Sequence, residues 1–268
     1  MSFENKIVIS NNELIIIQTD ENFFCFPTKQ LNHALSYLNN DFDIGMRRWI
    51  KLNCKSDSTF IDIGANVGTF SAVASKLITG NGTVIAIEPI SSLENCIRQN
   101  VMLNNSAVNF EYIPVALSNK SGDIELQLFD LDNRVSTLWK YGENKKNVST
   151  IKNVKVKTGK LDKEIKSLNE DTVIKVDVEG SEMEILQQIN LLSERFSNSN
   201  FTIAFEYSPS HFKRANTSST EIINFIMENF RCSCYFIDEF DGTNKEKLSE
   251  HNINKSGNVS FSFCKNKI

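Results

Sequence analysis

The sequence of 268 residues lacks long apolar runs, an export signal and an excess of basic residues. No stretch approaches the roughly 18 apolar residues that a membrane-spanning helix needs. The first residues show neither the basic start nor the apolar stretch of a signal peptide. The formal net charge is −4, whereas proteins that bind nucleic acid need a basic surface. We therefore expect a protein with no membrane span and no nucleic-acid partner.

The six cysteines include no C-x-x-C pair, so a metal site built from cysteines is not expected. Cys232 and Cys234 stand two apart in an apolar run, which places both on one face of a predicted strand as small buried side chains. Free thiols together with the missing export signal favour a cytoplasmic location.

The first 55 residues predict a small N-terminal extension. Two short strands are expected between residues 7 and 26, around the polar turn Ser10-Asn11-Asn12, and a helix from about residue 30 to 53. This segment has too few apolar residues for a core of its own. We interpret residues 1–55 as an extension that packs on a main domain formed by residues 56–268.

The main domain alternates between strand and helix patterns. The predicted strands cover residues 59–63, 83–87, 109–113, 172–178, 201–206, 232–237 and 259–264. Three helices are expected to begin with Ser-x-x-Glu capping boxes, at Ser91, Ser181 and Ser218. Such alternation gives a parallel sheet with right-handed crossovers, and the last strand, with no helix before it, should run antiparallel. The sequence predicts a Rossmann-like, doubly wound α/β fold with a mostly parallel seven-stranded sheet.

The strongest signal for a binding site is the run Asp62-Ile63-Gly64-Ala65-Asn66-Val67-Gly68 after the first of these strands. Gly64 and Gly68 allow a sharp turn and a close approach of a ligand. The helix that follows points its N-terminus at that ligand. The next strand ends at Glu88, where an acidic side chain can accept both hydroxyl hydrogens of a ribose. This combination predicts a cofactor that contains a nucleoside.

The glycine loop also discriminates between cofactors. A pyrophosphate-binding loop usually reads G-x-G-x-x-G, whereas this loop reads G-x-x-x-G and follows Asp62. A carboxylate repels a pyrophosphate but suits the ammonium and sulfonium groups of S-adenosylmethionine (SAM). The charge therefore favours SAM over NAD and FAD, and a tight turn that binds nothing is the remaining alternative.

Acidic residues follow two further strands at the same edge. Asp177 and Glu179 stand two apart, so both face the ligand crevice if their strand continues to Glu179, and Glu206 ends the next strand. An ion pair with Lys175 or capping of the following helix are alternative roles. Among the histidines His211 is the best placed, because it follows Glu206 closely, although a surface role is the alternative.

These segments resemble the FkbM-type methyltransferases over roughly residues 55–210, and the D-x-E-G-x-E element from Asp177 to Glu182 is the most specific part. The family consists of class I SAM-dependent enzymes, mostly O-methyltransferases that act on sugars, glycans or polyketide-type natural products. The resemblance implies that Glu88 holds the ribose of SAM and that Ala116 lies near the adenine. It also implies a set of loop residues around the methionine part of SAM: Asp62, Gly64, Ala65, Asn66 and Gly68.

The sequence thus predicts SAM-dependent methylation of a hydroxyl on a sugar, glycan or natural product. A hydroxyl attacks well only while its proton is being removed, and a carboxylate acting as general base contributes about 10²–10⁴ in rate. Asp177, Glu179 and Glu206 are the candidates, in that order. A divalent cation held by these acids is an alternative, but no metal site is predicted.

Two other functions stay open, an N-methyltransferase that acts on an amine and a non-catalytic SAM-binding module. The expected partner is a small-molecule or carbohydrate acceptor, and the sequence leaves open whether the protein forms a homo-oligomer. Residues 130–160 are polar and predict variable loops with short strands, in which Trp139-Lys140-Tyr141 could stack on a sugar ring.

Overall fold

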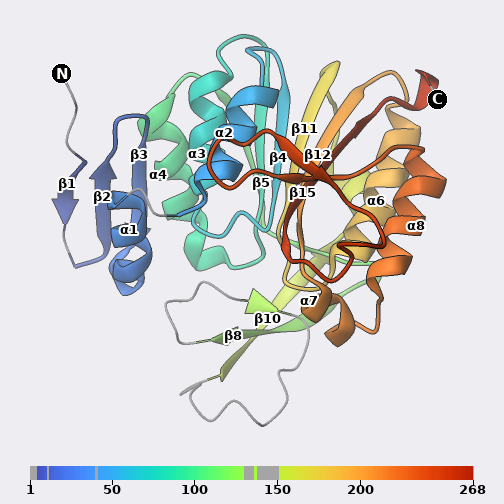
Figure 1. Ribbon diagram of the computed structural model, residues 1–268. Helices are drawn as coiled ribbons and strands as arrows, with labels where there is room; N and C mark the ends of the chain where they lie inside the picture. Colours follow the sequence, from blue (N-terminus) through green and yellow to red (C-terminus); the bar gives the residue numbers. More distant parts are fainter. Residues whose placement is uncertain (1–4, 11, 40–41, 130–135, 138–150, 268) are drawn as a thin grey trace.

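The computed structural model describes residues 5–10, 12–39, 42–129, 136–137 and 151–267 (Figure 1). The strands are β1 (Lys6–Ser10), β2 (Leu14–Gln18), β3 (Phe23–Pro27), β4 (Thr59–Ile63), β5 (Thr83–Ile87), β6 (Asn109–Ile113), β7 (Ala116–Leu117), β8 (Asp123–Phe129), β9 (Ser136–Thr137), β10 (Ile151–Gly159), β11 (Asp171–Val176), β12 (Asn200–Tyr207), β13 (Tyr235–Ile237), β14 (Asn244–Lys247) and β15 (Gly257–Phe263). The helices are α1 (Leu31–Leu38), α2 (Ile44–Asn53), α3 (Thr69–Leu77), α4 (Glu94–Asn104), α5 (Leu161–Glu164), α6 (Glu182–Arg195), α7 (Pro209–Arg214) and α8 (Ser219–Phe230), with 3-10 turns η1 (Thr28–Gln30), η2 (Ser91–Leu93) and η3 (Lys265–Lys267).

The central sheet has eight strands among the described residues, in the order β14-β13-β15-β12-β11-β4-β5-β6. The five strands β6, β5, β4, β11 and β12 run parallel, and β15 pairs antiparallel with β12. The predicted doubly wound α/β fold with an antiparallel last strand is therefore confirmed. The count of seven was one short, because β14 pairs with β13 and adds a strand at the edge.

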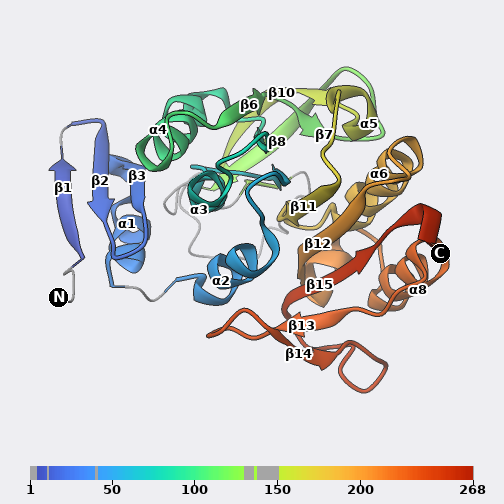
Figure 2. The ribbon, with the colours of Figure 1, turned by 90° about the horizontal axis from the view of Figure 1, so that it is seen from above.

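Both faces of this sheet are buried, because successive side chains of a strand point to opposite faces. Phe60 and Val173 belong to the core on the side of α3 and α4, whereas Ile61 and Ile174 belong to the core on the side of α6 and α8. Figure 2 shows these two pairs of helices on either side of the strands. Strands covered on both faces are apolar almost throughout, which makes them easy to identify in the sequence.

The N-terminal extension forms a three-stranded antiparallel sheet, β1-β2-β3, followed by α1 and α2. Its docking depends on Asn100 of α4, whose amide accepts a hydrogen bond from the Cys25 N–H at 2.7 Å and donates to the Cys25 carbonyl at 2.8 Å. The same amide donates to the Val67 carbonyl of the glycine loop at 2.7 Å. One side chain thus joins the edge of β3 to the loop of the predicted site.

Two expectations about the extension were wrong. Three strands replace the predicted two, because the Thr19 N–H donates to the Asn22 carbonyl and closes a turn within the second apolar run. The single predicted helix is divided into α1 and α2. The sequence Asn39-Asn40-Asp41-Phe42-Asp43 between them is rich in residues that favour turns, and Asp43 has a left-handed backbone with φ of 53°.

Three expectations about the main domain also change. Strand β11 ends at Val176, so the strand does not continue to Glu179, whose backbone is left-handed with φ of 55°. The polar segment before residue 160 contains the nine-residue strand β10, which pairs with β8 in a small separate sheet (Figure 1). The capping box at Ser218 is confirmed, whereas the side chains of Ser91 and Ser181 cap no helix.

No helix in the described part of the chain is both long and apolar enough to cross a membrane. The predicted sugar-stacking residues Trp139-Lys140-Tyr141 lie outside the described residues.

Candidate functional site

A cavity lies where β4, β5 and β11 end, at the carboxyl edge of the sheet. Its empty space, including the part open to solvent, is about 700 Å³. One side is apolar and includes Val115, Ala116 and Leu117, while Glu88 and Asp177 face it with carboxylates. We call this space the first cavity. Two residues predicted to contact the cofactor, Ala116 and Glu88, thus line one cavity together.

Glu88 is held in place by the backbone of two loops. Its carboxylate accepts hydrogen bonds from the N–H groups of Asn66 and Ile90, each at 2.9 Å. Burial raises the pKa of Glu88 to about 7, although the two hydrogen bonds oppose this. Each carboxylate oxygen has a further lone pair, so the side chain can still accept hydroxyl hydrogens from the cavity.

The glycine loop turns sharply beneath this cavity. The N–H groups of Gly64 and Ala65 both donate to the Ile87 carbonyl, at 3.0 and 3.1 Å. Gly64 has φ of 73°, and a Cβ there would lie only 1.9 Å from the Asp177 carbonyl oxygen. Gly68 has φ of 87°, and a Cβ there would lie 3.0 Å from Cα of Ile97, so the glycine also lets the loop pack closely on α4. Only glycine meets both requirements at these positions.

Asp62 lies behind the loop and is fully buried. Its carboxylate accepts hydrogen bonds from the backbone N–H and the hydroxyl of Ser71, at 3.1 and 2.8 Å. Its other oxygen lies 3.3 Å from Nζ of Lys175, the residue directly opposite on β11. Lys175 also donates to the Gly64 carbonyl at 3.0 Å and lies 3.7 Å from a carboxylate oxygen of Asp177. The pair of Asp62 and Lys175 therefore joins the glycine loop to the end of β11.

A second cavity adjoins the first and shares part of its lining. Gly64, Asn66, Asp177 and Glu179 border both spaces. Glu206 borders the second, so the three predicted catalytic carboxylates surround one cavity. The opposite wall comes from the N-terminal extension and consists of His33, Tyr37, Phe42 and Asp43. A ligand in the first cavity and a ligand in the second would thus meet at the ends of β4 and β11.

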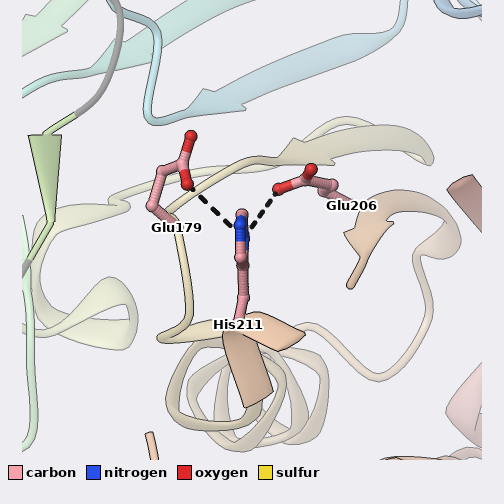
Figure 3. A group of neighbouring side chains, drawn as sticks. All are labelled: Glu179, Glu206 and His211. Atoms are coloured by element: carbon pink, nitrogen blue, oxygen red, sulfur yellow. Dashed lines mark ion pairs between the residues drawn. The ribbon is translucent and has the colours of Figure 1, made fainter. Parts of the chain in front are cut away.

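His211 on α7 joins two of these carboxylates (Figure 3). Its Nδ1 lies 3.4 Å from an oxygen of Glu179 and 3.3 Å from an oxygen of Glu206. The Glu206 carboxylate raises the pKa of His211, against the effect of burial, and Glu179 adds to the increase. Burial raises the pKa of Glu179 to about 7, with contributions from Asp177 and Glu206. Glu179 is therefore close to half ionised at neutral pH.

The cluster of Glu179, Glu206 and His211 also has the composition of a metal site, since one atom from each residue lies within 4.8 Å of the others. Carboxylate and imidazole groups are ligands for several divalent cations. The ion pairs to His211 account equally well for the arrangement without a metal.

Sequence reasoning missed the wall that the extension contributes. The aromatic side chains of Tyr37 and Phe42 are packed together, with ring centroids 5.6 Å apart, and Tyr37 donates a hydrogen bond to Thr69 of α3 at 2.9 Å. The Asn- and Asp-rich segment before α2 was the available signal for a break in the helix. The position of Tyr37 and Phe42 beside the strand ends depends on tertiary packing.

The strand order, the glycine loop and the acidic strand ends together define a Rossmann-like α/β protein with the class I methyltransferase fold. The chain belongs to the family described as Vibrio cholerae RfbT protein, whose model matches residues 1–265. The narrower FkbM-type resemblance stays a prediction. No curated protein matches the sequence.

Among solved structures, the chain is similar to a SAM-dependent methyltransferase from Agrobacterium tumefaciens, with a TM-score of 0.47, 8% identity and coverage of 96% of this chain and 72% of the other. It is also similar to an rRNA methylase from Streptococcus thermophilus, with a TM-score of 0.42, 10% identity and coverage of 83% and 97%. A third is TYW2 from M. jannaschii in complex with AdoMet, with a TM-score of 0.43, 9% identity and coverage of 96% and 88%. At such low similarity these structures carry no argument about activity or acceptor.

Proposed function

We propose that this protein is a SAM-dependent methyltransferase that methylates a hydroxyl group. One observation carries the proposal: two cavities meet at the ends of β4 and β11, one bordered by Glu88 and apolar side chains and the other by three carboxylates. The first suits a nucleoside, and the second, which adjoins it, suits the rest of the cofactor together with an acceptor whose proton must be removed. The FkbM-type resemblance of the D-x-E-G-x-E element supports the same function.

The residues of the first cavity fit SAM. The apolar side chains of Val115, Ala116 and Leu117 would cover the adenine, and Glu88 would accept hydrogen bonds from the ribose hydroxyls. SAM supplies a methyl group on a positively charged sulfur, which needs no further activation. Asp177 and Glu179 give this region negative charge, which attracts a sulfonium and repels a pyrophosphate. Asp62, which lines neither cavity, would act by holding the loop.

Glu179 is the best candidate for the general base. Its carboxylate borders both cavities, and its pKa of about 7 matches proton removal at neutral pH. His211 does not border the cavities, so we assign it the role of a positioning residue between Glu179 and Glu206. Alignment of the acceptor oxygen with the methyl group would contribute several further kcal/mol.

The acceptor class follows from the walls of the second cavity. A lining that combines aromatic rings with carboxylates suits a ring that carries hydroxyl groups, as in a sugar or a glycan. An amine would also be attracted by the acids, and identification of the methylated atom in the product separates O- from N-methylation.

The division of the chain at residue 55 and the cytoplasmic location of the protein stay predictions.

We expect SAM and S-adenosylhomocysteine to raise the melting temperature, while NAD and FAD leave it unchanged. A ligand present at about 100 times its Kd stabilises the native state by about 2.7 kcal/mol. The carboxylates of Glu88, Asp177 and Glu179 around the first cavity disfavour a pyrophosphate. A thermal-shift titration with the four ligands measures this. Stabilisation by NAD without any effect of SAM would contradict the proposed function.

Replacement of Glu88 by alanine should weaken SAM binding by about 1–3 kcal/mol, because the ribose hydroxyls lose their acceptor. The variant also frees the N–H groups of Asn66 and Ile90, so its melting temperature must be measured alongside. Glu111→Ala, which removes an exposed carboxylate of the neighbouring β6, is the matched control. Calorimetry that finds equal SAM affinity in Glu88→Ala and Glu111→Ala would show that Glu88 does not contact the ribose.

A further inference from the structure

Asp43 is the residue of the N-terminal extension that carries a negative charge to the second cavity. It precedes α2 and borders both this cavity and a neighbouring cleft between α2 and β13. The same cavity is lined by loop residues Gly64 to Val67 and by Thr69 in the first turn of α3. Asp43 therefore lines the same cavity as the segment that the FkbM-type resemblance assigns to the methionine part of SAM.

Capping of α2 does not account for the position of the Asp43 carboxylate. It occupies the N-cap position of α2, but its side chain accepts no capping hydrogen bond. Among the described residues, none donates a hydrogen bond to it or forms an ion pair with it. Its backbone has φ of 53°, a conformation that costs free energy in a residue other than glycine and is enriched at functional sites.

The other acidic groups nearby already have partners. Asp62 accepts two hydrogen bonds from Ser71 and pairs with Lys175, and Asp177 lies 3.7 Å from the same ammonium. Glu179 and Glu206 share His211. Burial raises the pKa of Asp43 to about 7 and Asp177 adds to the increase, while the charges of Lys175 and Arg47 act against it. A cation in direct contact with Asp43 would oppose the increase that remains.

We propose that Asp43 accepts a charge-assisted hydrogen bond from the α-ammonium group of the methionine part of SAM. This inference rests on the proposed function. It assigns recognition of the ammonium to Asp43 in place of Asp62. The start of α3 borders the same cavity through Thr69, so its positive dipole end would favour a carboxylate bound there. The extension thereby completes the cofactor site and does more than support the fold.

The test compares two ligands that share adenosine and a neutral thioether. S-adenosylhomocysteine retains the amino-acid group, whereas 5′-methylthioadenosine lacks it. Calorimetry on the full chain should find that Asp43→Asn binds S-adenosylhomocysteine about 10- to 100-fold more weakly, the range expected for one charge-assisted hydrogen bond. Its affinity for 5′-methylthioadenosine should stay within about twofold of the wild-type value, a change below roughly 0.5 kcal/mol.

Asparagine tolerates a left-handed backbone, so Asp43→Asn should keep the local fold. Asp43→Gly, which also tolerates it, is the second variant, and Asp20→Asn removes an exposed carboxylate of the same extension as a control. Unchanged affinity for S-adenosylhomocysteine in both Asp43 variants would overturn the inference and leave the proposed function intact. Equal losses for the two ligands would also overturn it. Failure of the wild-type protein to bind either ligand would instead overturn the proposed function.

Discussion

Turnover of Glu179→Gln should fall by about 10²-fold or more, because the neutral amide cannot take the proton of the acceptor hydroxyl. SAM affinity should fall much less than turnover, since glutamine keeps the size of the side chain and Asp177 keeps a carboxylate beside the first cavity. An assay of methyl transfer to a panel of deoxysugar nucleotides and glycans identifies the acceptor, and turnover is then measured for each variant. Glu228→Gln, which alters an exposed carboxylate of α8, should keep wild-type turnover.

The pH profile gives a second measurement of the same prediction. The pKa of Glu179 is raised to about 7, so the carboxylate is mostly protonated at pH 6 and mostly ionised at pH 8. Wild-type turnover should therefore rise with pH through about 7, and the residual activity of Glu179→Gln should lose this rise. Asp177→Asn and Glu206→Gln should show smaller losses. Full turnover in all three variants would refute the catalytic role of these acids.

Removal of divalent cations separates general-base catalysis from metal catalysis at this cluster. If Glu179, Glu206 and His211 act without a metal, EDTA leaves wild-type turnover unchanged, and this is the expected result. Loss of activity in EDTA and recovery with magnesium or manganese would assign the cluster to a metal instead.

Replacement of Lys175 by methionine should lower the free energy of unfolding by about 3–5 kcal/mol, the cost of leaving a buried charge without its partner. Asp62 is fully buried and Lys175 is 3% exposed, so water cannot replace the lost ammonium. The double variant Lys175→Met with Asp62→Asn should recover much of this loss. Urea unfolding monitored by circular dichroism measures all three proteins.

The exposed pair of Lys55 and Asp171 provides the control, because its two charged groups are also in contact, at 2.6 Å. Lys55→Met should cost about 1 kcal/mol or less, since water screens an exposed pair. If Lys175→Met is no more destabilised than Lys55→Met, the pair of Asp62 and Lys175 does not stabilise the loop as described.

The sequence alone predicted the residues of the central strands, the glycine loop and the acidic strand ends. Periodicity was sufficient for this, because strands such as Thr59–Ile63 are buried on both faces and are apolar almost throughout. Gly64 and Glu88 are also local signals: a sharp turn needs glycine, and an acid at the end of a buried strand is conspicuous.

Only the tertiary structure decided which of these residues line a cavity. Asp62 has the same sequence context as a ligand-contacting carboxylate, yet its partners Ser71 and Lys175 hold it behind the loop. Asp43 carries no motif, and its place beside the second cavity depends on how the extension packs on α3 and α4. Local sequence encodes turns and strands, whereas the position of a charge relative to a cavity depends on contacts between residues far apart in the chain.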